Sequence, residues 1–247
     1  MIELVNVHKS FNNKKILDSV SIKIEKGETF VIIGQSGVGK TTILRHIAGF
    51  FDPDHGDVFI EAERMNGADP AKKSRLRERM GFLFQSGALI NWLTVRENVA
   101  LPLAEHRLGS ISEINRIVDE KLELLQLLDS GDKMPADISG GMKKRAGLAR
   151  AIVRNPSIIL YDEPTSGLDP VMSARISDMI IRMKSELGVT SVVVTHDMVS
   201  AYNIADRIAM LYNGSIIECG TPEQIRGSSS PIVRQFVEGS LIGPIEV

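Results

Sequence analysis

Residues 34–41 have the spacing of a phosphate-binding loop, since they read Gly-Gln-Ser-Gly-Val-Gly-Lys-Thr and fit G-x-x-x-x-G-K-[ST]. Glycines let backbone N–H groups turn inward around a β-phosphate, Lys40 can reach the β and γ oxygens, and the Thr41 hydroxyl can ligate magnesium. By chance the four fixed positions would match in roughly one chain of this length in a hundred. The residues expected to hold nucleotide here are Gly34, Gln35, Ser36, Gly37, Val38, Gly39, Lys40, Thr41 and Thr42.

A pair of carboxylates follows the apolar segment 158–161. Asp162 is expected to hold magnesium through water, and Glu163 can accept a proton from the water that attacks a γ-phosphate. The plain alternative is a strand that merely ends in acidic turn residues, and the phosphate loop argues against it. Together the two motifs predict ATP hydrolysis, with magnesium as the cofactor.

The triplet Ser139-Gly140-Gly141 precedes a helix expected over about 142–154. A small hydroxyl and two bare amides at a helix start make a second phosphate site. Two anion sites with only one phosphate loop suggest that ATP is shared between two copies of the chain. A simple serine N-cap is the plain alternative. The basic run 143–145 that follows is expected to be a solvated helix face.

Two further polar residues follow expected strands. His196 comes after the buried run 192–195, where ligands bind in doubly wound folds, so it is a candidate γ-phosphate sensor. Gln85 ends the apolar strand 80–84 and is a candidate reporter of magnesium or the attacking water. A structural histidine and an ordinary turn glutamine are the plain alternatives.

Strands and helices must position these groups. Residues 2–8 and 20–25 alternate apolar and polar side chains around Asn12-Asn13, which predicts antiparallel strands with one wet face. Residues 29–33 form a continuous apolar run, and a helix is expected over 40–48. This strand, loop and helix have the order of a nucleotide fold.

Later segments predict a parallel sheet and a helical lobe. A helix over 170–187 lies between buried strands at 158–161 and 191–194, which suits a parallel crossover. From about Leu89 to Arg154 helical periodicity takes over, and Ser110 with Glu113 has the spacing of a capping box. The apolar residues expected on one buried face of this lobe are Ile114, Val118, Leu122, Leu125 and Leu128.

Composition limits the function classes. A chain of 247 residues with 43% hydrophobic and 24% charged residues suits one α/β domain with a lobe attached. The net charge of −2 gives no field that would draw it to nucleic acid. Cys219 is the only cysteine, which excludes an internal disulfide and suits a reducing cytosol. No apolar run approaches the ~20 residues that span a bilayer, so we expect any membrane role to come from partners.

The motifs lie in the order found in ABC ATPases, which the chain resembles over nearly its whole length. The resemblance implies a P-loop NTPase (RecA-like) α/β core with an antiparallel β subdomain and an inserted α-helical subdomain. It also implies that Phe11 stacks on adenine, that Asp169 lines the dimer seam, and that His196 contacts the γ-phosphate. The matching segments are the phosphate loop, Gln85, Ser139-Gly140-Gly141, Asp162-Glu163, Ser166-Gly167-Leu168-Asp169 and Thr195-His196-Asp197.

A narrower likeness rests on residues 83–89, 93–103 and 139–145. Together these segments look like the ATPases of MCE-associated lipid transporters of the Mla type, which move lipid between the bacterial inner membrane and a periplasmic lipid-binding protein. Met142 replaces the glutamine of most ABC signatures, so the polar contact expected near the ribose does not carry over. Ile138 replaces the usual leucine.

We therefore predict an ATPase subunit that works as a homodimer on the cytoplasmic face of the inner membrane, bound to permease subunits and, through them, to an MCE lipid-binding protein. An importer ATPase for amino acids or another small solute would share every catalytic motif. A non-transport ABC protein acting on nucleic acid or ribosomes should show tandem units or a basic surface. The expected domains are 1–238, with a helical subdomain at about 88–155, and a tail at 239–247.

Two apolar segments predict docking. Trp92 lies among apolar residues after Gln85 and is the expected anchor for a permease helix. Residues 231–247 are more apolar than a solvated tail needs. We expect this tail to dock on its own domain or on a partner.

Overall fold

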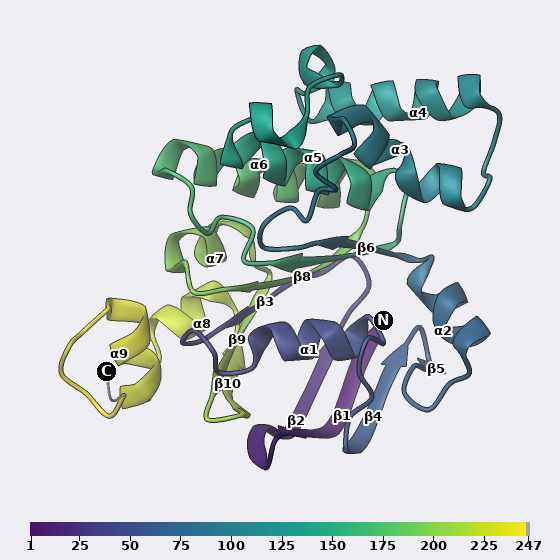
Figure 1. Ribbon diagram of the computed structural model, residues 1–247. Coiled ribbons are helices and arrows are strands. Elements are labelled where there is room, and N and C mark those ends of the chain that lie inside the picture. Colours follow the sequence, from purple (N-terminus) through teal and green to yellow (C-terminus); the bar gives the residue numbers. More distant parts are fainter. Residues whose placement is uncertain (246–247) are drawn as a thin grey trace. The chain divides into compact units, whose positions relative to one another are not determined.

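The computed structural model describes residues 1–245. The chain forms two compact units, which we describe separately. The first unit comprises Met1–Leu76 and Val192–Val247, and the second comprises Arg77–Ser191. Strand β8 (Thr190–Thr195) crosses from the second unit into the first along the chain. Figure 1 labels the elements.

The first unit contains an antiparallel sheet in the order β2-β1-β4-β5. Strands β1 and β2 pair with Ile2 opposite Ile24 and Phe11 opposite Lys14. Both strands extend further toward the Asn12-Asn13 turn than the sequence pattern predicts. From Val20 to Ile24 alternate residues of β2 are buried, as expected for a sheet with one wet face. The strands are β1 (Ile2–Phe11), β2 (Lys14–Ile24), β4 (His55–Ile60) and β5 (Glu63–Arg64).

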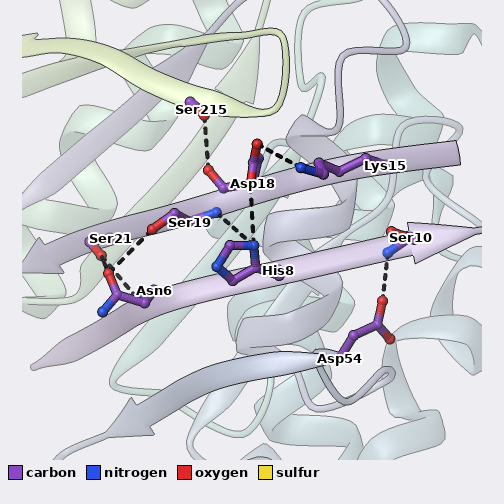
Figure 2. A network of polar contacts seen from close by, with 9 residues as sticks. All are labelled: Asn6, His8, Ser10, Lys15, Asp18, Ser19, Ser21, Asp54 and Ser215. Carbon is purple, nitrogen blue, oxygen red and sulfur yellow. Dashed lines mark hydrogen bonds and ion pairs between the residues drawn. The ribbon is translucent and has the colours of Figure 1, made fainter.

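A polar network joins neighbouring segments of this sheet, as Figure 2 shows. The Asp18 carboxylate on β2 forms an ion pair with the Lys15 ammonium at 3.0 Å, and it lies 3.2 Å from Nδ1 of His8 on β1. The Asp54 carboxylate accepts the backbone N–H of Ser10 at 2.7 Å. The network therefore ties the β1–β2 hairpin together close to its turn.

A second group of strands in the first unit surrounds β3 (Thr29–Ile33), which is buried at every position. β3 pairs in parallel with β9 (Arg207–Tyr212), and β9 pairs antiparallel with β10 (Ser215–Gly220). Cys219 lies on β10 and is exposed. The helices of this unit are α1 (Lys40–Ile47), α2 (Pro70–Arg77), α7 (Met198–Ile204), α8 (Pro222–Arg226) and α9 (Pro231–Glu238).

The second unit packs helices around α5 (Gly140–Ile152), which contacts α3, α4 and β6 (Figure 1). A Cβ on Gly81 of β6 would lie 2.3 Å from the carbonyl oxygen of Ala151, so only glycine allows this close approach. Strand β6 pairs in parallel with β7. The elements are β6 (Met80–Leu83), α3 (Val95–Glu105), α4 (Ile111–Leu124), the 3₁₀ turns Leu128–Ser130 and Pro135–Asp137, β7 (Ile158–Asp162) and α6 (Pro170–Leu187).

The predicted helix start at Ser110 is confirmed. Its hydroxyl accepts the N–H of Glu113, and the Glu113 carboxylate accepts the N–H of Ser110. Val118, Leu122 and Leu125 are fully buried, as expected. The prediction that Leu128 lies on the buried face is wrong, since its side chain is 42% exposed. The reason is that α4 ends at Leu124 and Leu128 begins a separate 3₁₀ turn.

The tail docks on its own unit. α9 contacts α8, and Val233 is fully buried. The buried Gln235 side chain donates to the Ile245 carbonyl at 3.1 Å and accepts the Ile245 N–H at 2.6 Å. Leu241 and Ile242 remain exposed between these anchors. Residues 246 and 247 lie outside the described residues. Throughout residues 1–245, every helix is too short or too polar to span a membrane.

Candidate nucleotide-binding and catalytic site

The phosphate loop follows β3 and can be built only with glycine at its start. Gly34 has φ +150°, and a Cβ there would lie 2.4 Å from the carbonyl oxygen of Leu211. Lys40 is only 5% exposed, and its Nζ donates to the carbonyls of Gly34 at 2.7 Å and Gln35 at 3.0 Å. These bonds hold the ammonium against the loop that the sequence predicts will carry phosphates.

Helix α1 begins directly after this loop. Its N-cap residue, Gly39, has φ +113° and brings no side chain to cap the first turn. Thr41 and Thr42 lie in that turn and are half-buried. Backbone N–H groups and a positive dipole end therefore point toward the loop, which is the arrangement that binds anions.

A pocket of about 340 Å³ opens beside the loop. The start of β2 supplies Lys14 and Lys15 to its wall, and Lys15 forms an ion pair with Asp18. Such a lining fits the phosphates of a nucleotide. The motif search missed the hairpin and the β9–β10 turn because both lie far from the loop in sequence. The lining residues are Lys14, Lys15, Ile16, Gln35, Ser36, Gly37, Val38, Asn213 and Gly214.

Phe11, the expected adenine-stacking residue, ends β1 and is 39% exposed. Its ring meets the ring of Phe51 edge-on at 5.6 Å, and the Lys9 ammonium lies 5.4 Å from the ring centre. Phe11 does not line the pocket beside the loop. The exposed part of this ring is what a planar group could contact.

The two carboxylates of the second unit lie at the end of the buried strand β7. Asp162 is its last residue and is 6% exposed, while Glu163 follows at 8% exposed. Glu163 has φ +48°, a backbone region that residues other than glycine rarely occupy. Its carbonyl oxygen accepts the N–H of Ser166 at 3.2 Å, which closes the turn after the strand.

The basic run of α5 is not the solvated face that the sequence suggests. Lys144 is 5% exposed and donates from Nζ to the Glu163 carbonyl at 2.9 Å. Arg145 is 7% exposed and donates to the carbonyls of Leu125 and Gln126. Burial lowers the pKa of Lys144 to about 8, against the opposing pull of the Glu163 and Asp162 carboxylates. The side chains of Lys144 and Arg145 therefore donate hydrogen bonds to backbone carbonyls inside the unit.

The signature triplet forms the start of α5. The Ser139 hydroxyl accepts the N–H of Met142 at 3.3 Å, so the serine is an N-cap. Ser139 and Gly140 are exposed, and a Cβ on Gly140 would meet no atom within 4 Å. A Cβ on the buried Gly141 would lie 2.6 Å from the terminal Cε of Met172, so the methionine side chain would have to move aside.

The structure also places the other predicted residues. Gln85 lies beyond β6, which ends at Leu83 and not at residue 84 as expected, and its side chain donates to the Ser166 hydroxyl at 3.4 Å. Asp169 is exposed and caps α6 by accepting the N–H of Met172. His196 is exposed and follows β8. The second unit thus brings Gln85, Ser166 and the Glu163 turn together.

The segment after Gln85 is held by a residue that sequence reasoning missed. Asn98 is fully buried in α3; its side chain accepts the N–H of Ile90 at 2.7 Å and donates to the carbonyls of Ile90, Leu93 and Thr94. These four bonds fix the loop that carries Trp92, which is 79% exposed. The sequence did contain a signal for this residue, because Asn98 is a polar residue among the apolar residues on the buried face of α3.

The sequence profile of ABC transporters matches residues 17–166, more than half of the chain. The chain belongs to the ABC transporter family. As an ABC protein it binds and hydrolyses ATP, in agreement with the phosphate loop, the carboxylate pair and the signature described above.

Individual ABC proteins align over almost the whole chain. The intermembrane phospholipid transport system ATP-binding protein MlaF of Escherichia coli K12 is 38% identical over 99% of this chain and 91% of its own. The probable ribonucleotide transport ATP-binding protein mkl of Mycobacterium tuberculosis H37Rv is 40% identical over 99% of this chain and 68% of its own. A solved ATP-binding cassette, a dimer in a post-hydrolysis state with ADP and phosphate, is 34% identical with a TM-score of 0.83, covering 90% of this chain and 99% of its own.

Proposed function

We propose that two copies of this chain hydrolyse ATP in shared sites and thereby drive a membrane permease that moves phospholipid or another lipid. The observation that carries the proposal is the similarity to MlaF, which spans nearly the full length of both chains. The solved relative with ADP and phosphate is a dimer, which supports the two-copy arrangement. The exposed start of α5 supports a site completed by a second copy.

In each shared site one copy supplies the phosphate loop. Its N–H groups and Lys40 bind the β- and γ-phosphates, and Thr41 with Asp162 and Gln85 would hold magnesium. When bound, magnesium neutralises charge on the β- and γ-phosphates. The Glu163 carboxylate accepts a proton from the attacking water.

The second copy supplies Ser139-Gly140-Gly141, whose exposed hydroxyl and amides contact the γ-phosphate. Asp169 lines the seam between the copies. His196 contacts the γ-phosphate from the copy that holds the phosphate loop, and Phe11 stacks on adenine. The exposure of Asp169 and His196 supports these roles, because each side chain can reach a ligand or a partner.

We assign residues 1–238 to the ATPase domain, with the helical subdomain at about 88–155, and residues 239–247 to a tail. The subdomain includes α3, α4 and α5 of the second unit. We place the protein on the cytoplasmic face of the inner membrane, where permease subunits bind it and link it to an MCE lipid-binding protein.

The permease docks on the loop that Asn98 holds, with Trp92 as the anchor. An indole that is 79% exposed on a fixed loop is an apolar group ready for burial by a partner. Hot spots of interfaces are enriched in tryptophan for this reason.

The relatives' names differ in cargo, since mkl is named for ribonucleotides and MlaF for phospholipids. We favour lipid because the MlaF alignment covers 91% of that protein, against 68% for mkl. The likeness in residues 83–89 and 93–103, the segment expected to meet the permease, points the same way.

The test is purification of the full chain from membranes in mild detergent, followed by identification of bound proteins and lipids. The wild-type chain should bring a polytopic membrane protein with phospholipid. Trp92→Ala should recover at least ~10-fold less of it, because loss of a hot spot costs about 2 kcal/mol or more. Ile111→Ala is the matched control, since Ile111 is 80% exposed on α4 and has no proposed contact.

The purified complex is then placed in vesicles that contain fluorescent phospholipid, with radiolabelled ribonucleotide or amino acid offered in parallel. Phospholipid should move on addition of ATP and should stay in place with Glu163→Gln. Movement of the ribonucleotide or amino acid without the phospholipid would contradict the proposed cargo. Equal recovery of the permease with Trp92→Ala would contradict the docking site.

A further inference from the structure

A buried lysine contacts the backbone of the proposed catalytic glutamate. Lys144 is 5% exposed, and its Nζ donates to the carbonyl oxygen of Glu163 at 2.9 Å. Lysine is almost never fully buried unless its charge is compensated. The fold holds this ammonium inside the second unit, beside the turn that follows β7.

The contacted backbone is strained. Glu163 has φ +48°, which only glycine and a few polar residues adopt readily. Its carbonyl oxygen accepts two bonds, from the Ser166 N–H at 3.2 Å and from Lys144 at 2.9 Å. Strained backbone persists where surrounding contacts over-determine it, and the Lys144 bond is one such contact.

The same helix begins at the signature. Lys144 lies five residues after Ser139, in the second turn of α5. In the proposed dimer, the signature of a chain serves one ATP site and its Glu163 serves the other. Because a helix is stiff, α5 and Lys144 connect these two parts within a single chain.

We propose that Lys144 is a positioning residue for ATP hydrolysis, whose ammonium fixes the Glu163 backbone and so aims the Glu163 carboxylate. It touches neither ATP nor the attacking water. The inference rests on the general-base role proposed for Glu163, and the experiment includes Glu163→Gln so that the two can fail separately.

The first measurement is steady-state ATP hydrolysis by the full chain, at protein concentrations at which the dimer is fully formed. Lys144→Met keeps an unbranched side chain of similar size but removes the donor. The kcat should fall by about tenfold or more, as expected for loss of a hydrogen bond from a charged group. The KM for ATP should stay within about twofold, because nucleotide binding is left to the phosphate loop. Lys144→Arg, which keeps a cationic donor, should recover most of kcat.

Lys121→Met is the matched control. Lys121 lies on α4 of the same unit and donates to the Asn155 side chain at 2.7 Å, so this change also removes a lysine hydrogen bond. It should leave kcat unchanged. Both methionine variants should melt within a few degrees of the parent. If Lys144→Met melts far lower, Lys144→Gln takes its place in the same measurements.

A double variant separates positioning from general loss of structure. If Lys144 acts through the Glu163 carboxylate, adding Lys144→Met to Glu163→Gln should change single-turnover hydrolysis by less than about twofold. The inference is overturned if Lys144→Met keeps wild-type kcat, raises only KM, or slows hydrolysis equally with and without Glu163→Gln. Normal turnover by Glu163→Gln alone would instead remove the role proposed for Glu163.

Discussion

The starts of α1 and α5 are both glycine-rich, yet they are built differently. The N-cap of α1 is Gly39, which has φ +113° and offers no side chain to the first turn. The N-cap of α5 is Ser139, whose hydroxyl already accepts the N–H of Met142. Lys40 lies at the first position of α1, whereas α5 begins with the exposed Gly140.

This difference indicates a division of labour. The α1 start combines uncapped geometry, a buried lysine and an adjoining pocket of about 340 Å³, so it can bind phosphate within one chain. The α5 start is an exposed helix end that its own serine caps. We therefore expect it to bind a phosphate only when a second copy brings ATP to it. Variants at the two starts should therefore fail in different ways.

The largest effect is expected from damage to both starts in separate copies. Lys40→Ala should lose ATP binding, and Ser139→Arg should block closure on the partner's phosphate, so each homodimer should hydrolyse ATP at least ~100-fold more slowly. In a mixture, one shared site collects both changes and its twin collects neither.

The mixture should therefore exceed either variant alone in steady-state hydrolysis, provided that one intact site supports turnover. The control is the Lys40→Ala chain alone at the same total protein concentration. A mixture no faster than this control would contradict the assignment of the two starts to one shared site.

Alanine at the two glycines should separate folding from assembly. Gly39→Ala forces a side chain into φ +113° within 3.1 Å of Ile16 and Leu17, and should lower the free energy of unfolding by about 1–3 kcal/mol. Gly140→Ala meets no atom within 4 Å, so stability should hold while ATP-dependent dimerisation falls. Denaturant melts and light scattering measure the two effects. Equal dimerisation by Gly140→Ala and the parent would show that the α5 start meets no partner.

Apart from the loss of its proposed phosphate contact, Ser139→Ala is expected to change the folding of the chain only slightly. Loss of this N-cap should cost about 1 kcal/mol of stability and lower Tm by a few degrees. The cap is a local property, so the melting shift should appear without nucleotide. An unchanged Tm would mean that the 3.3 Å bond to Met142 contributes little to the helix start.

Much of the framework was readable from the sequence because its signals are local. The apolar run at Thr29–Ile33, the Asn12-Asn13 turn and the Ser110–Glu113 box each depend on neighbours within a few residues. Helix α6 occupies its predicted range, 170–187, with Asp169 as N-cap and Gly188 as a left-handed C-cap.

The buried polar groups were not readable, because their partners are distant in sequence. Lys144 bonds a carbonyl 19 residues away, and Arg150 bonds Gly87 63 residues away. Composition rules assign such cations to the surface, since burial of a charge is costly unless specific oxygens receive it. The pocket wall from Lys14 and Lys15 was missed for the same reason.

The fixed loop around Trp92 has a kinetic consequence. Because the Asn98 amide makes four bonds to the backbone of Ile90, Leu93 and Thr94, the backbone that carries the indole is held in one arrangement before any partner arrives. Only the Trp92 side chain remains to be ordered on docking, so encounter with a permease should need no slow rearrangement of the loop. Residence time would then be set by how well the partner encloses the ring.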